Sequence, residues 1–251
     1  MPYAIAMAGK GGTGKTTIAG FLIKYLVQKG KTPILAVDAD SNTNLNEVLG
    51  ISIKETLGKA REEMKDGIVK QGMTKQMFME MKLAESIVEG KGFDLIAMGR
   101  PEGAGCYCAA NNLLSMYLGK LLDNYPYMVM DNEAGMEHIS RLTTNNVDLL
   151  LIVSDPSLRG IEAAGRINTL VDDLKLNVEK RLLIINQARD GLADSLLDAI
   201  AKQGLSLAGT IPRDDLVYEF DMSGNPTFAL PENNPALSKA FYIFDKIIEV
   251  S

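Results

Sequence analysis

A glycine-rich stretch near the start of the chain carries the strongest signal for chemistry. It runs Gly9-Lys10-Gly11-Gly12-Thr13-Gly14-Lys15-Thr16 and matches the pattern G-x-x-x-x-G-K-S/T. Glycines let successive backbone N–H groups turn toward phosphate oxygens, and a helix that starts near Lys15 adds the positive end of its dipole. We expect Lys15 to neutralise the β and γ phosphates of a nucleotide and the Thr16 hydroxyl to bind Mg²⁺. The predicted phosphate contacts are Gly11, Gly12, Thr13, Gly14, Lys15, Thr16 and Thr17.

Acidic residues follow two apolar runs further along the chain. Asp38 and Asp40 come after the run Pro33–Val37, and Asp131 ends the run Tyr127–Met130. An acid at the end of an apolar strand is the Walker B pattern, so we expect Asp131 to hold Mg²⁺ through water. Ligands of open α/β sheets bind at the carboxyl ends of the strands, where a carboxylate can also orient water. The alternative for Asp38 and Asp40 is that they cap the helix that follows.

The two cysteines, Cys106 and Cys108, lie two positions apart. A pair this close favours a metal or redox site in a reducing compartment over a disulfide framework. Two thiolates do not complete a site, because zinc prefers four tetrahedral ligands and nickel(II) can take four thiolates in a plane. A twofold dimer that brings both loops together would complete either site. The alternative is a pair of inert buried thiols.

The elements that must position these residues alternate between short apolar runs and longer segments of helical period. The run Leu149–Val153 is apolar at every position, as expected when helices cover both faces of a parallel sheet. We therefore predict an α/β P-loop NTPase fold with a mostly parallel sheet of about seven to eight strands and helices on both faces. The predicted strands are Tyr3–Met7, Pro33–Val37, Phe93–Met98, Tyr127–Met130, Leu149–Val153, Arg181–Ile185 and Leu207–Ile211. The predicted helices are Lys15–Lys29, Asn111–Leu122, Gly160–Leu174, Asp194–Gln203 and Ala236–Val250.

The segment from Ile51 to Gly92 interrupts this alternation. It has no strand pattern and many charges. We expect a mostly helical insertion in a single ATPase domain that spans residues 1–251. Methionine usually fills irregular apolar gaps, so its methionines are expected in a core or at a partner contact, and metal binding by their thioethers is the alternative. They are Met64, Met73, Met77, Met79 and Met81.

Composition narrows the choice of partners and compartment. The formal net charge is −6, and no basic stripe would hold a nucleic-acid backbone. No apolar run approaches the roughly 20 residues that cross a bilayer, and residues 1–10 resemble a strand and a glycine loop more than a signal peptide. We expect a cytoplasmic protein that binds neither nucleic acid nor membrane.

With Lys10 as well as Lys15, the phosphate loop resembles the deviant Walker A motif of the MinD and ParA class of ATPases. The resemblance implies an ATP-sandwich homodimer in which Lys10 reaches across the interface and places a cation on the departing γ-phosphoryl group. It also implies that Asp40 aligns the attacking water and that Asp38 lies near Mg²⁺. In that class an asparagine such as Asn186 reads the adenine edge, and a loop such as the one at Pro212 flanks it. The chain lacks the N-K-x-D motif of guanine-binding proteins.

Three features together resemble the CooC-type nickel-insertion ATPases that mature carbon monoxide dehydrogenase. They are the phosphate loop, the Cys106-x-Cys108 pair and the segment from Asp131 to His138. The resemblance covers nearly the whole chain, and Asn132-Glu133 is similar to the AcsF branch associated with the carbon monoxide dehydrogenase/acetyl-CoA synthase complex. It implies an ATP-dependent metallochaperone in which the cysteine pairs of both chains hold Ni²⁺ or Zn²⁺ until hydrolysis reopens the dimer near that client.

Some assignments stay open at this point. Glu133 has no assigned role, and His138 could be a metal ligand, a proton carrier or a structural hydrogen-bonding residue. A MinD or ParA-like positioning ATPase is one rival, although Ala236–Val250 lacks the basic amphipathic character of a membrane-targeting tail. An iron–sulfur cluster carrier is a second, because four cysteines from two chains could bridge a cluster. A nitrogenase-reductase-like electron donor is a third, but it would need a more conventional cysteine placement.

Overall fold

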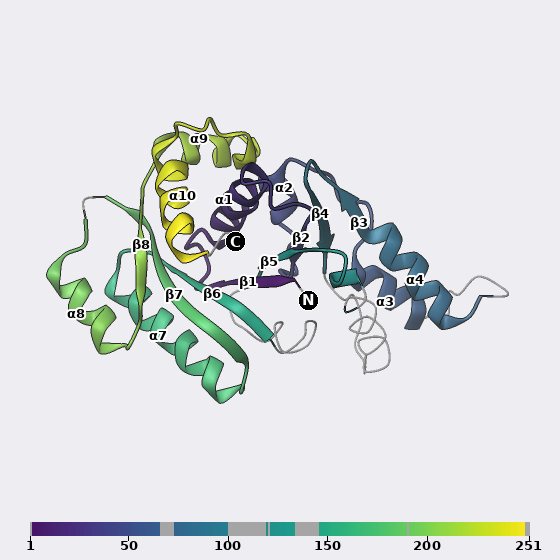
Figure 1. Ribbon diagram of the computed structural model, residues 1–251, viewed down its shortest axis with the longest axis horizontal. Helices are drawn as coiled ribbons and strands as arrows, with labels where there is room; N and C mark the ends of the chain where they lie inside the picture. The colour runs from purple at the N-terminus through teal and green to yellow at the C-terminus, as the bar shows by residue number, and fades with distance from the viewer. Residues whose placement is uncertain are drawn as a thin grey trace.

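A computed structural model describes residues 2–65, 73–99, 119, 121–133, 146–189 and 191–248 of the chain. Within these residues the strands are β1 (Tyr3–Gly9), β2 (Ile34–Asp38), β3 (Ile87–Glu89), β4 (Phe93–Ala97), β5 (Tyr127–Asp131), β6 (Asn146–Ser154), β7 (Asn177–Ala188) and β8 (Leu207–Pro212). They form one eight-stranded sheet in the order β3-β4-β2-β5-β1-β6-β7-β8 (Figure 1). Neighbouring strands pair in parallel, except that β3 is antiparallel to β4. The predicted mostly parallel sheet is confirmed.

All seven strands expected from the sequence are present, and β3 is an addition. It lies between residues 51 and 92, where we expected no strand, and that expectation was wrong. β3 has three residues and pairs with β4 at the edge of the sheet. So short a strand carries too little alternation for a sequence pattern to reveal.

Helices cover both faces of the sheet, as Figure 1 shows. One layer packs on an apolar cluster beneath α1 (Lys15–Gln28), α2 (Leu45–Leu49), α9 (Asp215–Met222), the short 3₁₀ helix η1 (Thr227–Ala229) and α10 (Pro235–Ile247). The other layer packs on a second cluster with α3 (Leu57–Lys65), α4 (Lys75–Ser86), α7 (Leu158–Asp173) and α8 (Asp194–Lys202). In the described part of the chain, no helix is both long and apolar enough to span a membrane.

β1 illustrates why the central strands must be apolar throughout. Ala4, Ala6 and Ala8 pack into the cluster on the α7 side, whereas Ile5 and Met7 pack into the cluster beneath α1. All five side chains are buried, so neither face of the strand tolerates a polar residue. Because β1 is held between two packed layers, the loop that follows it starts from a fixed position.

The helices differ from the sequence expectations at two places. α1, α7, α8 and α10 form within a few residues of the predicted bounds, and the predicted helix Asn111–Leu122 lies mostly outside the described residues. α9 was not predicted, and α2 was expected only as the helix that Asp38 and Asp40 would cap, without bounds. Helices of five and eight residues make at most about two turns, so their apolar periodicity is weak.

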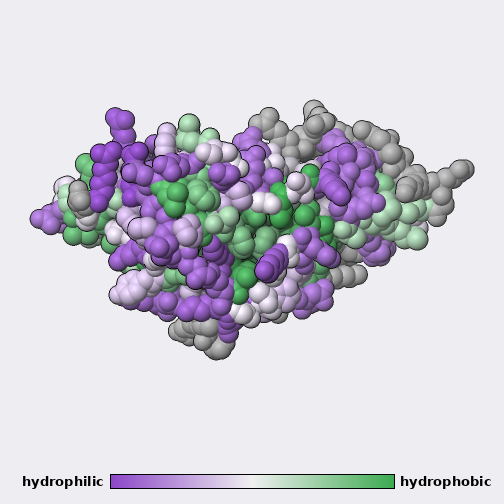
Figure 2. All heavy atoms as spheres, turned by 90° about the horizontal axis from the view of Figure 1, so that it is seen from above, coloured by the Kyte–Doolittle hydropathy of each residue, from purple (hydrophilic) through white to green (hydrophobic). Residues whose placement is uncertain are grey.

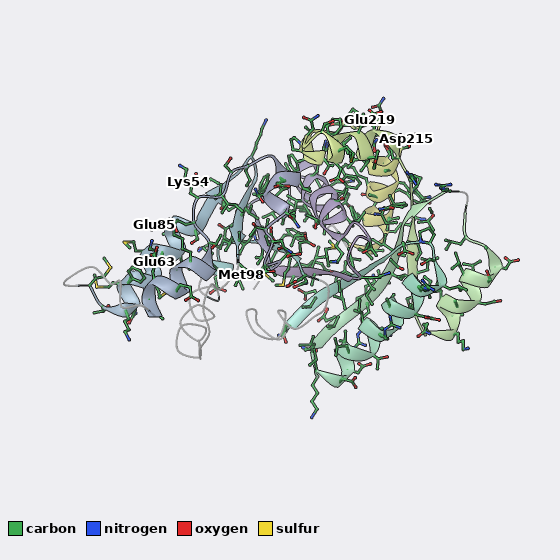
Figure 3. All side chains as sticks on the ribbon, turned by 180° about the vertical axis from the view of Figure 1, so that it is seen from behind. Lys54, Glu63, Glu85, Met98, Asp215 and Glu219 are labelled. Atoms are coloured by element: carbon green, nitrogen blue, oxygen red, sulfur yellow. The ribbon has the colours of Figure 1, made fainter. Side chains whose placement is uncertain are left out.

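The helices α3 and α4 of the 51–92 segment form a pair beside one edge of the sheet (Figure 1). Lys82 on α4 lies 2.8 Å from Glu63 on α3 and 3.2 Å from Glu85 on its own helix; Figure 3 labels both acids. Met64 and Met79 are buried in the apolar cluster, as expected for residues that fill gaps, whereas Met77 is exposed. Contact between Met77 and a partner protein stays a prediction.

Candidate nucleotide-binding site

The parallel strands bring the predicted site residues to one edge of the sheet. Strands β1, β2 and β5 are neighbours and end at Gly9, Asp38 and Asp131 respectively. A pocket of about 580 Å³ opens beside these ends. Its lining includes the phosphate loop together with Asp40, Asn42, Asn44 and Glu133. The sequence-predicted phosphate and acidic groups therefore do converge.

The phosphate loop is held by its own side chains and by β7. The Thr13 hydroxyl donates to the Lys10 carbonyl at 2.9 Å, and Asn186 Nδ2 donates to the Thr13 carbonyl at 2.9 Å. Gly14, the residue immediately before α1, has a φ of 87°, in the left-handed region. A Cβ at Gly14 would lie 2.4 Å from Asn186 Nδ2, so a glycine is required on both counts.

The two lysines of the loop lie in opposite environments. Lys15 is 8% exposed and its Nζ donates to the Lys10 carbonyl at 3.3 Å, whereas the Lys10 side chain is exposed. Burial lowers the pKa of Lys15, and the nearby carboxylates of Asp131, Asp40 and Glu133 oppose that shift. The loop therefore has a buried cation, which a phosphate site would need, and an exposed cation, which a contact with a second chain would need.

Asp38 and Asp131 lie side by side because they pair in register between β2 and β5. Both are buried, and Asp131 is 2% exposed. Burial raises the pKa of Asp131 to about 7, with the charge of Asp38 adding to the rise and a hydrogen bond from Thr16 opposing it. Burial likewise raises the pKa of Asp38 to about 6. Two adjacent buried carboxylates are unfavourable unless a cation comes to them.

Mg²⁺ fits this arrangement. Asp131 Oδ1 is buried with no hydrogen-bond partner among the described residues, and the Thr16 hydroxyl contacts the same carboxylate. Within the described residues no group of three His, Cys, Asp or Glu side chains could enclose a metal ion. Mg²⁺ commonly takes one or two protein oxygens and completes its shell with water and nucleotide phosphates, so Thr16 and Asp131 suffice.

The loop after β2 is organised by its own acids. Asp38 Oδ1 accepts from the Asp40 amide at 3.1 Å, and Oδ2 accepts from the amide of Leu45, the first residue of α2, at 2.9 Å. Asp40 accepts from the Asn42 amide at 2.8 Å and lines the pocket. The capping role for Asp38 fits these contacts, and roles in metal binding and water alignment stay predictions.

A second pocket, of about 320 Å³, adjoins the first at Gly14 and Thr17. Asn186, Pro212 and Arg213 line it, which brings together the two segments expected to flank adenine. The Asn186 side-chain nitrogen is already bound to the phosphate loop. A contact between Asn186 and the base therefore stays a prediction.

Two groups of predicted residues lie outside the described part of the chain. They are Cys106 and Cys108, and the segment after Glu133 that includes His138. Glu133 itself lines the larger pocket.

The sequence interpretation missed a further group of residues that line the larger pocket. They are Asp221, Asn225 and Thr227, in α9 and the residues after it. The signal for α9 was Asp214, whose side chain accepts from the Val217 amide and caps the helix shortly after a proline.

Comparisons with known proteins agree with this geometry. Residues 4–228 match the family described as the CobQ/CobB/MinD/ParA nucleotide binding domain. An uncharacterised ATP-binding protein of Methanocaldococcus jannaschii is 42% identical over 97% of this chain and 98% of its own length. The carbon monoxide dehydrogenase accessory protein CooC of Rhodospirillum rubrum is 32% identical over 88% of this chain and 87% of its own.

Solved structures show the same fold. A ParA family ATPase of Chlorobium tepidum has a TM-score of 0.71 at 19% identity, covering 96% of this chain and 97% of that one. The MinD cell division protein of Aquifex aeolicus has a TM-score of 0.69 at 22% identity, covering 99% of this chain and 98% of that one. The chain therefore belongs to the CobQ/CobB/MinD/ParA family of nucleotide-binding domains.

Proposed function

We propose that this protein is a homodimeric ATPase that uses its nucleotide cycle to insert nickel into carbon monoxide dehydrogenase/acetyl-CoA synthase. The observation that carries the proposal is the coexistence of a complete phosphate pocket with the Cys106-x-Cys108 pair in a chain 32% identical to a carbon monoxide dehydrogenase accessory protein. The pocket supports ATP binding, and the cysteine pair supports a metal cargo.

Hydrolysis would use the charges that the loop presents. A water oxygen attacks the γ phosphorus, the bond from that phosphorus to the oxygen of ADP breaks, and ADP and inorganic phosphate leave. Lys15 would hold the β and γ phosphates in cis, and Asp40 would orient the water. Lys10 is exposed and could therefore serve the nucleotide of a second chain. Mg²⁺, held by Thr16 and Asp131 with Asp38 close by, would neutralise phosphate charge.

A chain of backbone contacts supports coupling between the nucleotide pocket and the cysteine segment. The Met98 amide donates to the Asp38 carbonyl at 2.8 Å, and the Gly58 amide donates to the Met98 carbonyl at 2.7 Å. Cys106 follows Met98 by eight residues. If Asp38 and Asp40 moved toward a γ-phosphate, Met98 would move with them through its hydrogen bond to Asp38. Because Met98 precedes the cysteine pair and also binds Gly58 of α3, both regions would respond to the nucleotide.

The test is anaerobic binding of nickel and zinc, with and without ATP, to the wild type and to a Cys106→Ser/Cys108→Ser double variant. We expect about one metal per dimer in the wild type, shifted in affinity by ATP and lost in the double variant. Lys15→Ala is the matched control, because it should keep the cysteines and lose the response to ATP. Metal binding that ignores both the cysteines and ATP would overturn the nickel proposal while leaving ATP binding intact.

The main rival is a positioning ATPase, and the family description supports it because that description includes MinD and ParA. Co-sedimentation with liposomes or plasmid in the presence of ATP distinguishes it, since the nickel proposal predicts no ATP-dependent pelleting. The second rival, an iron–sulfur carrier, predicts visible absorbance after anaerobic purification.

A further inference from the structure

Four residues line both pockets of the candidate site. They are Gly14, Thr17, Gln187 and Asp221. In a nucleotide the sugar joins the phosphates to the base. If the phosphates lie on the loop and the base lies in the smaller pocket, as the proposed function requires, the sugar must pass these four residues.

Asp221 is the one carboxylate among the four. It lies in the last turn of α9 and is exposed. Among the described residues no side chain forms a hydrogen bond or an ion pair with its carboxylate. A carboxylate without a cation repels phosphate, so its natural partner on a nucleotide is a neutral donor. The vicinal hydroxyls of a ribose supply two such donors to one carboxylate.

Asn225 gives a second indication on the same wall of the pocket. Asn225 is exposed, whereas the hydroxyl of nearby Thr227 is fully buried and does not reach the pocket. Asn225 and Asp221 both line the larger pocket, so this wall presents amide and carboxylate groups and no cation. That chemistry fits a sugar and not a phosphate.

Other acids of α9 are used differently. Asp214 Oδ1 accepts from the Val217 amide and from Asn234 Nδ2, which makes it a structural cap. Asp215 and Glu219 line neither pocket, and Figure 3 shows both at the outer edge of the molecule. In Figure 2, which views the molecule from the side that carries α9, most of the surface is polar. Asp221 is therefore distinguished by its position and not by its charge.

We propose that Asp221 accepts hydrogen bonds from the 2′- and 3′-hydroxyls of the ribose, so that the protein selects ribonucleotides over deoxyribonucleotides. The inference rests on the proposed nucleotide function and adds the sugar specificity of that site. A hydrogen bond to a charged acceptor discriminates by roughly tenfold or more in affinity.

The test measures Mg²⁺-dependent binding of ATP, 2′-deoxy-ATP and 3′-deoxy-ATP to the full chain by calorimetry. The variants are Asp221→Ala and, as a matched control, Glu219→Ala, which removes a carboxylate from the same helix. We expect the wild type and Glu219→Ala to prefer ATP by about tenfold over either deoxynucleotide. In Asp221→Ala the three nucleotides should bind with equal affinity, because ATP loses two hydrogen bonds and each deoxynucleotide loses the one made by its remaining hydroxyl.

Three results would overturn the inference. Equal binding of ATP and both deoxynucleotides by the wild type would remove sugar selection while leaving the nucleotide site intact. A preference that survives in Asp221→Ala would assign it to other residues, and an equal loss for all three nucleotides would place Asp221 at the phosphates or base. Failure of the wild type to bind any nucleotide would instead refute the proposed function on which the inference rests.

Discussion

Lys10 and Lys15 belong to one loop but should respond differently to truncation. Lys15 is buried with its Nζ directed over the loop, whereas the Lys10 side chain is exposed. We expect Lys15→Ala to weaken ATP binding by roughly 100-fold, because a buried cation on the phosphates is lost. Lys10→Ala should keep ATP affinity within about threefold and lose most hydrolysis, because the proposed trans role places its cation on the nucleotide of a second chain. Calorimetry and phosphate release measure the two effects.

The exposed Lys91→Ala is the control for charge removal and should change neither quantity. If Lys10→Ala lost ATP affinity as severely as Lys15→Ala, the trans role of Lys10 would be untenable.

Gly14 should be far less replaceable than Gly11 of the same loop. The φ of 87° at Gly14 is unfavourable for alanine, and a Cβ at this position would lie 2.4 Å from Asn186 Nδ2. We expect Gly14→Ala to lower the free energy of unfolding by about 1–3 kcal/mol, because left-handed backbone and a steric clash combine. Urea unfolding measures it. Gly11→Ala is the control, since a Cβ there meets nothing within 4 Å, and an equal loss in both variants would contradict the argument.

The acid pair gives the site a pH dependence. In the metal-free fold the pKa of Asp38 is raised to about 6 and that of Asp131 to about 7, against an ordinary value of 3.8. Native protein therefore binds more protons than unfolded chain between about pH 4 and 7, and the metal-free fold gains stability as pH falls through that window. A protonated Asp131 cannot hold Mg²⁺, so affinity for Mg·ATP should drop as pH falls from about 8 to about 6.

Titration calorimetry across this pH range measures the dependence, and Asp131→Asn should bind Mg·ATP more weakly with a flatter pH profile. A wild-type affinity that stays constant across the range would show that Asp131 remains ionised without a metal.

At the scale of elements, Lys24 fastens α1 to the segment that follows α9. Its buried Nζ donates to the carbonyls of Phe228 and Leu230, the former at 2.8 Å, and burial lowers its pKa. We expect Lys24→Met to cost about 1–3 kcal/mol in urea unfolding, because two carbonyls lose their donor. Lys29→Met, at the end of α1, removes a half-exposed pair with Asp245 and should cost less than about 1 kcal/mol. Equal costs would mean that burial of Lys24 does not matter.

The sequence predicted elements best where periodicity and a fixed motif coincide. The run Leu149–Val153 is apolar because both faces are covered, and the phosphate loop lies between a strand and a helix as its motif requires. β3 and α9 were missed because three and eight residues give weak periodicity. Because α9 was not predicted, Asp221 was not recognised as a candidate site residue. Its position beside the pocket depends on tertiary packing, which no local sequence pattern encodes.

At the scale of the whole molecule, the order of the strands predicts a gradient of local stability. β1, β5 and β6 are paired on both sides and buried between two helical layers, whereas β3 and β8 form the edges. We expect amide hydrogen exchange to be slowest in the three central strands and fastest at the edges. Mass spectrometry after exchange measures it, and added Mg·ATP should protect residues 10–17 and 38–45. Fast exchange in β1 would contradict the packing described above.

The parallel order of the strands also places the candidate site and the turns that enter several strands at opposite ends of the sheet. All described site residues lie toward the carboxyl ends of the strands, while the turns that enter β2, β5 and β7 lie at the opposite end. Exposed residues in those turns, Thr32, Asn124 and Lys175, line neither nucleotide pocket. They are therefore suitable attachment points for a fluorescent dye or an affinity handle that reports on the nucleotide cycle without touching it.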